Sequence, residues 1–171
     1  MILNLIKKRH DAVINKLLLT GVLLIFFAWY ISAFWYQLML LQGSSMEPAY
    51  HSGQFLILDK HSGSFSYNDV IAIKKDIATG FLVKRIVGVP GDIVYIDHGV
   101  LYINDEPKEE WQEEFEYAGI AAEPVVLDEG YYFVLGDNIG ESKDSRNSEI
   151  GLIKETEIKG KVLQFQSGKV H

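Results

Sequence analysis

The chain has 171 residues and contains no cysteine. That absence excludes disulfide frameworks, thiolate nucleophiles and cysteine-ligated zinc sites. The five histidines form no His-Glu-x-x-His motif, so the sequence predicts no metal centre. The chain is also too short for a two-domain cofactor enzyme, and no cofactor is expected. A Gly-x-Ser-x-Gly elbow and a phosphate-binding loop are also missing. The formal net charge of −7 argues against a nucleic-acid-binding protein, which would normally present a basic face.

Charged residues are missing altogether from Leu17 to Leu41. As a helix, this run would be roughly 37 Å long, which is enough to cross a hydrocarbon core of about 30 Å. A cleavable secretory signal is the competing interpretation, but Ile31 fits poorly as the small residue wanted two positions before Ala33. A buried core helix is disfavoured because no polar face interrupts the run. We therefore expect a retained transmembrane anchor over residues 17–41.

Charge is distributed unevenly around this run. Four of the 16 basic residues and one of the 23 acidic residues precede it, and these five are Lys7, Lys8, Arg9, Lys16 and Asp11. Basic residues beside a span stay on the cytoplasmic side. The sequence thus predicts a cytoplasmic basic N-terminus over residues 1–16 and an extracytoplasmic domain over residues 42–171.

The segment after the anchor has the pattern of short strands. Apolar, β-branched and aromatic runs alternate with turn residues, which indicates a mainly β, antiparallel and barrel-like domain rather than βαβ units. The expected strands are Phe55–Leu58, Val70–Ile73, Phe81–Val89, Ile93–Ile96, Val100–Ile103, Tyr131–Leu135 and Val162–Phe165. Asp97-His98-Gly99 predicts a hairpin turn, and Pro90-Gly91-Asp92 predicts another sharp reversal.

One stretch of this domain is strongly acidic. Asp105–Tyr117 holds seven acidic residues against Lys108 alone. A run of like charge is usually a solvated face, so we expect a surface excursion over residues 105–121. Contact with a partner, or repulsion of anionic headgroups, is the alternative.

Three segments of the domain carry residues capable of chemistry. The first, Gly43–Pro48, places Ser45 at most about 14 Å from the end of the apolar run. The second places Lys84 between the large aliphatic residues Leu82 and Ile86 on one strand face. Arg85 is flanked just as well, but arginine cannot deprotonate, so Lys84 is the only possible base of the two. A neutral lysine near pH 8 needs its pKa lowered by about 2 units through desolvation.

The third segment is the polar loop Gly136–Arg146, directly after an expected strand. It offers hydroxyl groups to orient an amine and carboxylates to pair with arginines. A Ser–His–Asp triad is the alternative constellation, but His51 and His61 flank Gly- and Ser-rich turns and are expected to be solvated.

Taken in order behind an N-terminal span, these segments resemble the bacterial type I signal peptidases, in their compact Gram-positive form. The resemblance rests on Ser45-Met46-x-Pro48, on Lys84-Arg85-Ile86-Val87-Gly88-x-Pro90-Gly91-Asp92, and on the Gly136–Arg146 loop. It implies a membrane serine protease that removes signal peptides after small residues.

The resemblance also implies a role for each motif residue. Ser45 is expected to be the nucleophile, Lys84 its general base, and Ser142 the residue that orients the Lys84 amine. Arg85–Asp137 and Asp144–Arg146 are the expected ion pairs. Met46 is a candidate wall of a substrate pocket, although core packing explains it equally well.

The chain departs from the commonest family pattern at Ala49, Gln54 and Ile139, and Gly43 lacks a hydroxyl that some members use in the oxyanion hole. The Ser45 N–H is therefore expected to be the main oxyanion donor. Expected partners are signal peptides of exported preproteins, membrane lipid and the secretion translocon, at the plasma membrane. A non-catalytic or specialised relative acting in pilus or surface-protein assembly is the main rival, and a self-cleaving Ser–Lys repressor is a more distant one.

Overall fold

A computed structural model describes residues 2–74, 80–109, 111 and 115–163 of the chain, with side chains from residue 9 onward. The chain divides into two compact units, Met1–Gln37 and Leu38–His171. The first unit is essentially one helix and the second is built almost entirely from strands. The expected composition of one N-terminal apolar helix and a mainly antiparallel β domain is confirmed.

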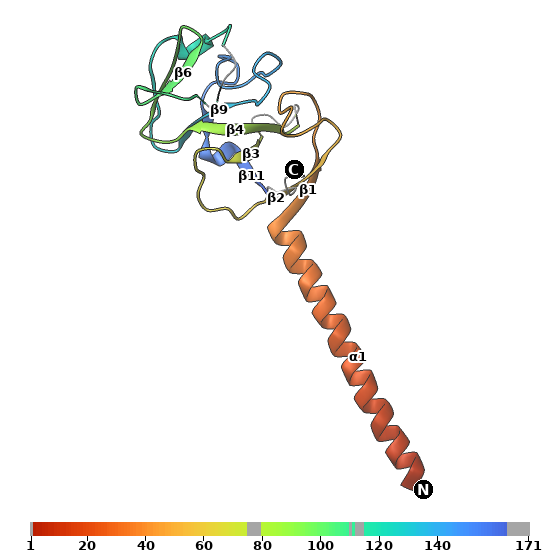
Figure 1. Ribbon diagram of the computed structural model, residues 1–171. Coiled ribbons are helices and arrows are strands. Elements are labelled where there is room, and N and C mark those ends of the chain that lie inside the picture. The colour runs from red at the N-terminus through yellow and green to blue at the C-terminus, as the bar shows by residue number, and fades with distance from the viewer. Residues whose placement is uncertain (1, 75–79, 110, 112–114, 164–171) are drawn as a thin grey trace. The chain divides into compact units, whose positions relative to one another are not determined.

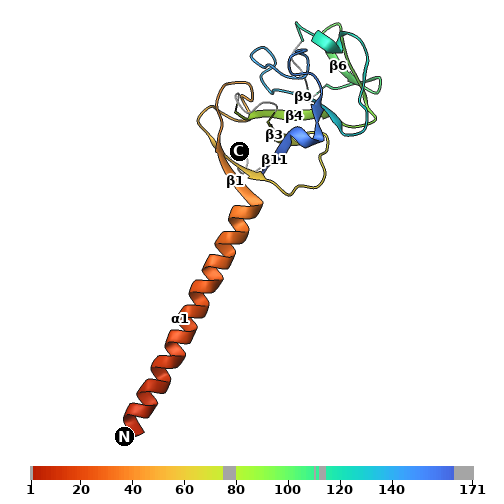
Figure 2. The ribbon, with the colours of Figure 1, turned by 180° about the vertical axis from the view of Figure 1, so that it is seen from behind.

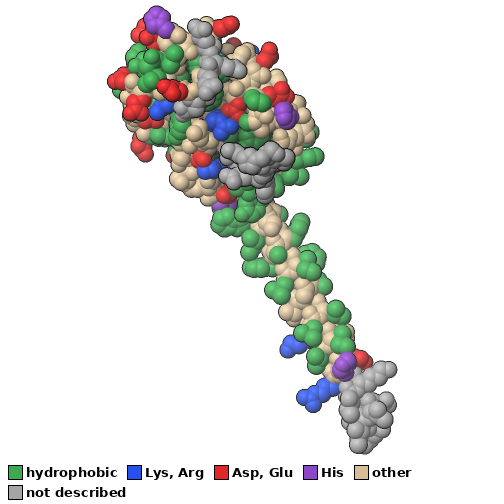
Figure 3. All heavy atoms as spheres, viewed as in Figure 1, with side chains coloured by type: hydrophobic (Ala, Val, Ile, Leu, Met, Phe, Trp, Pro, Cys, Tyr) green, Lys and Arg blue, Asp and Glu red, His purple; other side chains and the backbone are tan. Residues whose placement is uncertain are grey.

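The long helix α1 runs from Ile2 to Trp35 (Figure 1). Within the described residues, one helical segment, Arg9–Trp35, is long and apolar enough to cross a membrane, and none of it is buried within the structure. Figure 3 shows hydrophobic side chains along this helix and basic ones near its N-terminal end. Large apolar side chains such as Leu17 and Ile25 are 67% and 70% exposed, which water alone would disfavour.

The helix ends six residues before the apolar run does, so the expectation of a helical span to Leu41 was wrong at that end. Tyr36–Leu40 forms strand β1 instead. Alternate residues of β1 are half-buried, and Met39 packs against the core of the β domain. The uniform apolarity of the run concealed this two-residue period.

The strands form two sheets in which every described pairing is antiparallel. A seven-stranded sheet has the order β1-β2-β11-β3-β4-β9-β10, and a four-stranded sheet has the order β7-β6-β5-β8. Both ribbon views place β11, β3, β4 and β9 side by side (Figures 1 and 2). Beyond β1, the strands are β2 (Phe55–Asp59), β3 (Val70–Ile73), β4 (Leu82–Gly88), β5 (Ile93–Asp97), β6 (Val100–Ile103), β7 (Glu106–Pro107), β8 (Val125–Val126), β9 (Tyr131–Leu135), β10 (Ile153–Lys154) and β11 (Ile158–Val162).

Six of the seven expected strands lie where the sequence placed them, and the seventh does not. The run Val162–Phe165 overlaps the observed β11 only at Val162, and Phe165 lies outside the described residues. The reason is Gly160, which an apolar count overlooks. A Cβ there would lie 2.6 Å from the Asp59 carbonyl oxygen, so its absence lets β11 approach β2 closely.

The two predicted turns are present. Asp97 pairs with Val100 across a two-residue hairpin in which His98 and Gly99 have φ of 47° and 76°. In the second turn, the Asp92 N–H donates to the Val89 carbonyl at 3.0 Å and Gly91 has φ of 93°. Pro90 followed by a glycine of positive φ is typical of a type II turn.

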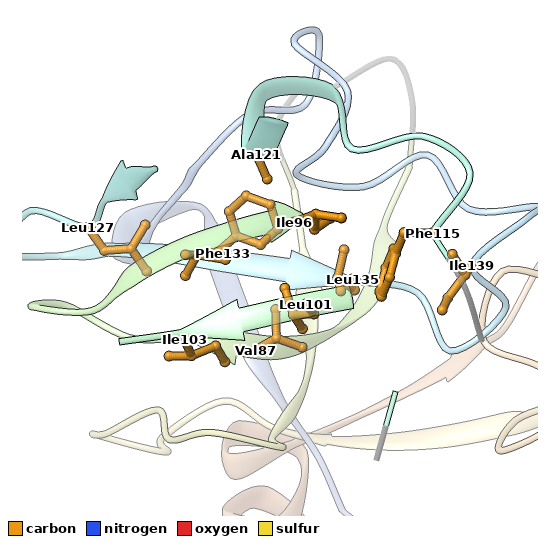
Figure 4. Close-up of a cluster of buried hydrophobic side chains, with 11 residues drawn as sticks. Val87, Ile96, Leu101, Ile103, Phe115, Ala121, Leu127, Phe133, Leu135 and Ile139 are labelled. Carbon is orange, nitrogen blue, oxygen red and sulfur yellow. The ribbon is translucent and has the colours of Figure 1, made fainter. Parts of the chain in front are cut away.

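A hydrophobic cluster packs between the two sheets, with Phe133, Leu101 and Val87 fully buried (Figure 4). Phe115 and Ala121 belong to this cluster, and the short 3-10 helix η1 (Gly119–Ala122) carries Ala121. The acidic stretch is therefore not purely a surface excursion, because its apolar residues enter the core. Its described acidic side chains are exposed as expected, whereas Glu110, Glu113 and Glu114 lie outside the described residues.

Candidate active site

Ser45 lies in a tight turn between β1 and β2. The base of this loop is closed by two backbone hydrogen bonds between Leu41 and the Gly53–Gln54 pair, of 2.8 and 2.9 Å. Within it, the Glu47 N–H donates to the Ser44 carbonyl at 3.1 Å and the Tyr50 N–H to the Met46 carbonyl at 2.8 Å. Since these bonds fix the backbone on both sides, the Ser45 hydroxyl projects from a rigid turn rather than from a loose loop.

Lys84 lies in the middle of β4, paired with Ile71 of β3. Its side chain is 3% exposed. The Lys84 Nζ lies 2.6 Å from the Ser45 Oγ, although the two residues are 39 positions apart in the sequence. The expected meeting of amine and hydroxyl is thus present in the structure, and a neutral amine at this distance is able to accept the hydroxyl proton.

Burial changes the acidity of this amine. Desolvation lowers the pKa of Lys84 from 10.5 to about 8, while the negative charges of Asp144 and Asp137 raise it in part and the Arg146 charge lowers it. A lysine of this pKa is substantially neutral in mildly alkaline solution. The same group in water would be almost fully protonated there.

Both expected ion pairs are present beside the dyad. Arg85 binds Asp137 through two bonds, Nε to Oδ1 at 2.7 Å and Nη2 to Oδ2 at 2.6 Å. Arg146 binds Asp144 in the same bidentate manner, with both distances 2.9 Å, and this pair is almost completely buried. The Asp144 Oδ2 also accepts the Gly136 N–H at 3.2 Å, which ties the pair to the end of β9.

Gly136 brings the third segment against the nucleophile. An added Cβ at this position would collide with the Ser45 carbonyl oxygen and with the Ser142 Oγ. Only glycine allows this close approach. The loop after β9 therefore lies directly against the backbone of Ser45.

Ser142 differs from its expected geometry. Its Oγ is buried but makes no hydrogen bond with any residue that the structure describes, so the expected bond to the Lys84 amine is absent. The short contact of the Lys84 Nζ is with Ser45 instead. Ser142 is nonetheless close to the dyad, because its Oγ and the Ser45 carbonyl oxygen both lie against Gly136.

Met46 is fully buried in a cluster with Leu58, Val70 and Val162, which favours its core-packing interpretation. A cavity of about 830 Å³ is lined in part by Arg85, Asp137, Pro48 and Ala49, and Met46, Ser45 and Lys84 are not part of its lining. The lining therefore includes the end of the nucleophile's turn but not the dyad itself.

Sequence reasoning missed the contribution of Asn138. Its backbone N–H donates to the Ser45 carbonyl at 3.1 Å, and its side-chain Nδ2 donates to the Ser44 carbonyl at 3.3 Å. The only signal in the sequence was its place in the polar loop after a strand.

The model of the family described as "Signal peptidase, peptidase S26" matches residues 14–165. The chain belongs to this signal peptidase family. Its match therefore includes Ser45, Lys84 and the loop after β9, and the protein is a peptidase of the signal peptidase I type.

Individual members of the signal peptidase family are similar over most of their length. Signal peptidase I of Bacillus licheniformis is 38% identical over 142 residues, which cover 76% of each chain. Signal peptidase I T of Bacillus subtilis is 34% identical over 151 residues, covering 81% of this chain and 78% of that one. A crystal structure of a signal peptidase I from Enterococcus faecalis aligns with 29% identity and a TM-score of 0.49, covering 59% of this chain and 97% of that one.

Proposed function

We propose that this protein is a membrane-bound serine endopeptidase that removes N-terminal signal peptides from exported preproteins, with Ser45 as nucleophile and Lys84 as general base. The observation that carries the proposal is the 2.6 Å separation of the Lys84 Nζ and the Ser45 Oγ, with the amine buried and its pKa lowered to about 8. Family membership supports the same substrate class.

In the proposed mechanism, the neutral Lys84 amine accepts the proton of the Ser45 hydroxyl while the Oγ attacks the carbonyl carbon of the residue before the cleavage site. The Ser45 N–H stabilises the resulting oxyanion. The protonated amine then gives its proton to the leaving amine, which releases the mature protein. A water molecule, deprotonated by Lys84, hydrolyses the acyl-enzyme and regenerates the serine.

The substrate is proposed to be an extended segment with small side chains at the cleavage site, as the resemblance implies. The remaining residues of the site brace the dyad rather than touch the substrate. The Arg85–Asp137 and Asp144–Arg146 pairs hold β4 and the loop after β9 in register around Lys84.

The proposed location is the plasma membrane, with α1 as a single span and the β domain on the outer side. The exposed apolar surface of Arg9–Trp35 supports a lipid environment for this helix. A substrate emerging from the bilayer, delivered by the secretion translocon, would then meet Ser45 close to the membrane surface.

The test is cleavage of a purified preprotein by the full chain in detergent, compared with Ser45→Ala and Lys84→Ala. We expect both variants to lose cleavage by three or more orders of magnitude while the circular dichroism spectrum of the native fold persists. Asp128→Ala, an exposed change away from the site, is the matched control. Substantial cleavage by either dyad variant would overturn the mechanism.

A further inference from the structure

Asn138 holds the two consecutive carbonyl groups that flank the nucleophile's own peptide N–H. Its side chain donates to the Ser44 carbonyl at 3.3 Å and its backbone N–H to the Ser45 carbonyl at 3.1 Å. No other pair of bonds in the described structure joins the loop after β9 to this turn in this way. Asn138 is half-buried and lies three residues beyond the end of β9.

The bond to the Ser44 carbonyl has a consequence for the other end of the same peptide group. The Ser44 carbonyl and the Ser45 N–H belong to one planar amide and point in opposite directions. The Ser44 oxygen also accepts the Glu47 N–H at 3.1 Å, so both of its lone pairs are used. The peptide plane therefore cannot rotate without breaking two hydrogen bonds, and the direction of the Ser45 N–H is fixed.

We infer that Asn138 is a positioning residue that aims the Ser45 N–H at the oxyanion formed during cleavage. The inference rests on the function proposed above, in which that N–H is the main oxyanion donor. Gly43 has no side chain to supply a second donor from the same turn. A hydrogen bond to the carbonyl oxygen also polarises the amide and strengthens its N–H as a donor.

The inference predicts a selective loss in Asn138→Ala. The alanine keeps the backbone bond to Ser45 and removes only the side-chain donor on Ser44. Since complete loss of an oxyanion donor costs about 10²–10³ in kcat, we expect misalignment to lower kcat by about 10-fold to 30-fold with little change in KM. The pH midpoint of the rate should stay near 8, because Asn138 carries no charge.

Two matched inhibitors separate this role from a general loosening of the site. With a signal-peptide aldehyde, the Ser45 Oγ adds to the aldehyde carbon and its proton passes to the Lys84 amine, which leaves an oxyanion. The corresponding peptide alcohol fills the same site without forming one. We expect Asn138→Ala to weaken the aldehyde about 10-fold or more and to leave the affinity of the alcohol unchanged.

Asn138→Asp provides a second variant of nearly identical shape, in which an oxygen replaces the donor. At pH 10, Asn138→Asp should weaken binding of the aldehyde at least as strongly as Asn138→Ala does. Asn104→Ala is the matched control, because Asn104 makes its side-chain bonds to Asp92 and Ile93, away from the dyad. Asn104→Ala should change the affinity of neither inhibitor.

Equal loss of aldehyde and alcohol binding in the Asn138 variants would overturn the inference, as would unchanged binding of both. A wild-type enzyme that binds the aldehyde no better than the alcohol, or that cleaves no preprotein, would instead overturn the proposed function beneath it. The two failures are therefore distinguished by the wild-type measurements alone.

Discussion

At the scale of single residues, the site depends on placing a lysine where water cannot reach it. Lys84 is 3% exposed, and its chemistry follows from the cost of charging it there. The unfolded chain binds the same proton more tightly, since the ordinary pKa is 10.5 and the folded value is about 8. The native protein is therefore destabilised by this group below pH 8, and the cost disappears as pH rises toward 10.5.

This linkage predicts that Lys84→Met abolishes cleavage but stabilises the fold at neutral pH. Because the variant lacks the group with the lowered pKa, we expect an increase in its free energy of unfolding of at most about 3 kcal/mol at pH 7. The gain should shrink between pH 8 and pH 10.5, as measured by denaturant unfolding of both proteins at each pH. A methionine variant that is less stable than wild type throughout this range would contradict the assigned burial cost.

At Gly136 we expect a substitution to impair cleavage by steric collision. Gly136→Ala forces a Cβ into the Ser45 carbonyl and the Ser142 hydroxyl, so we expect cleavage to fall by about 100-fold or more. Gly140→Ala, in the same loop with open space around it, is the control and should retain activity. Equal activity of the two alanine variants in a preprotein assay would show that the close approach is dispensable.

Functional residues were predictable from the sequence only where the reaction requires a particular type of side chain. Ser45 and Lys84 stand out because few residue types serve as nucleophile or base, and the ordered motifs paired them across 39 positions. Gly136 and Asn138 act through backbone geometry, which the sequence does not display. The sequence also could not show that the buried Ser142 hydroxyl has no hydrogen-bond partner among the described residues, because a hydroxyl's partner depends on rotamers.

At the scale of elements, the strands were predicted best where a short apolar, β-branched or aromatic run is bounded by turn residues. Val70–Ile73, Val100–Ile103 and Tyr131–Leu135 match the structure at both ends. β1 was hidden in a uniformly apolar run. β11 was missed because Lys159, Gly160 and Lys161 have little strand propensity of their own, and its pairing with β2 and β3 is tertiary.

The central place of β11 yields a prediction about the sheet. Gly160→Ala would push a Cβ against the Asp59 backbone, so we expect the free energy of unfolding to fall by about 1–3 kcal/mol. Gly63→Ala has open space and serves as the control. Chemical denaturation of both variants measures the difference, and equal stabilities would show that β2 and β11 separate at no cost.

The buried Asp144–Arg146 pair in the loop after β9 yields another prediction about stability. Asp144→Ala leaves Arg146, which is 4% exposed, without its carboxylate, and we expect a loss of about 3–5 kcal/mol. Replacing both residues with alanine and methionine should cost much less, because no buried charge remains unpaired. A single variant as stable as the double one in denaturant unfolding would contradict this explanation.

At the scale of the whole molecule, the proposed function requires the β domain on the outer side of the membrane and the basic end of α1 on the cytoplasmic side. Because the chain has no cysteine, single cysteines report topology without background. In intact cells, we expect Asp128→Cys to react with a membrane-impermeant maleimide and His10→Cys to react only after permeabilisation. Both positions are exposed in the structure, so labelling of His10→Cys in intact cells would reverse the topology.

The central claim is that a lysine neutralised by burial activates a serine remote in the sequence. The most direct measurement is the pH dependence of kcat/KM for a signal-peptide substrate between pH 6 and pH 10, on the full chain in detergent. We expect a rising limb with a midpoint at about 8, matching the lowered pKa of the Lys84 amine. A rate that is independent of pH across this range, or that rises only near 10.5, would contradict it.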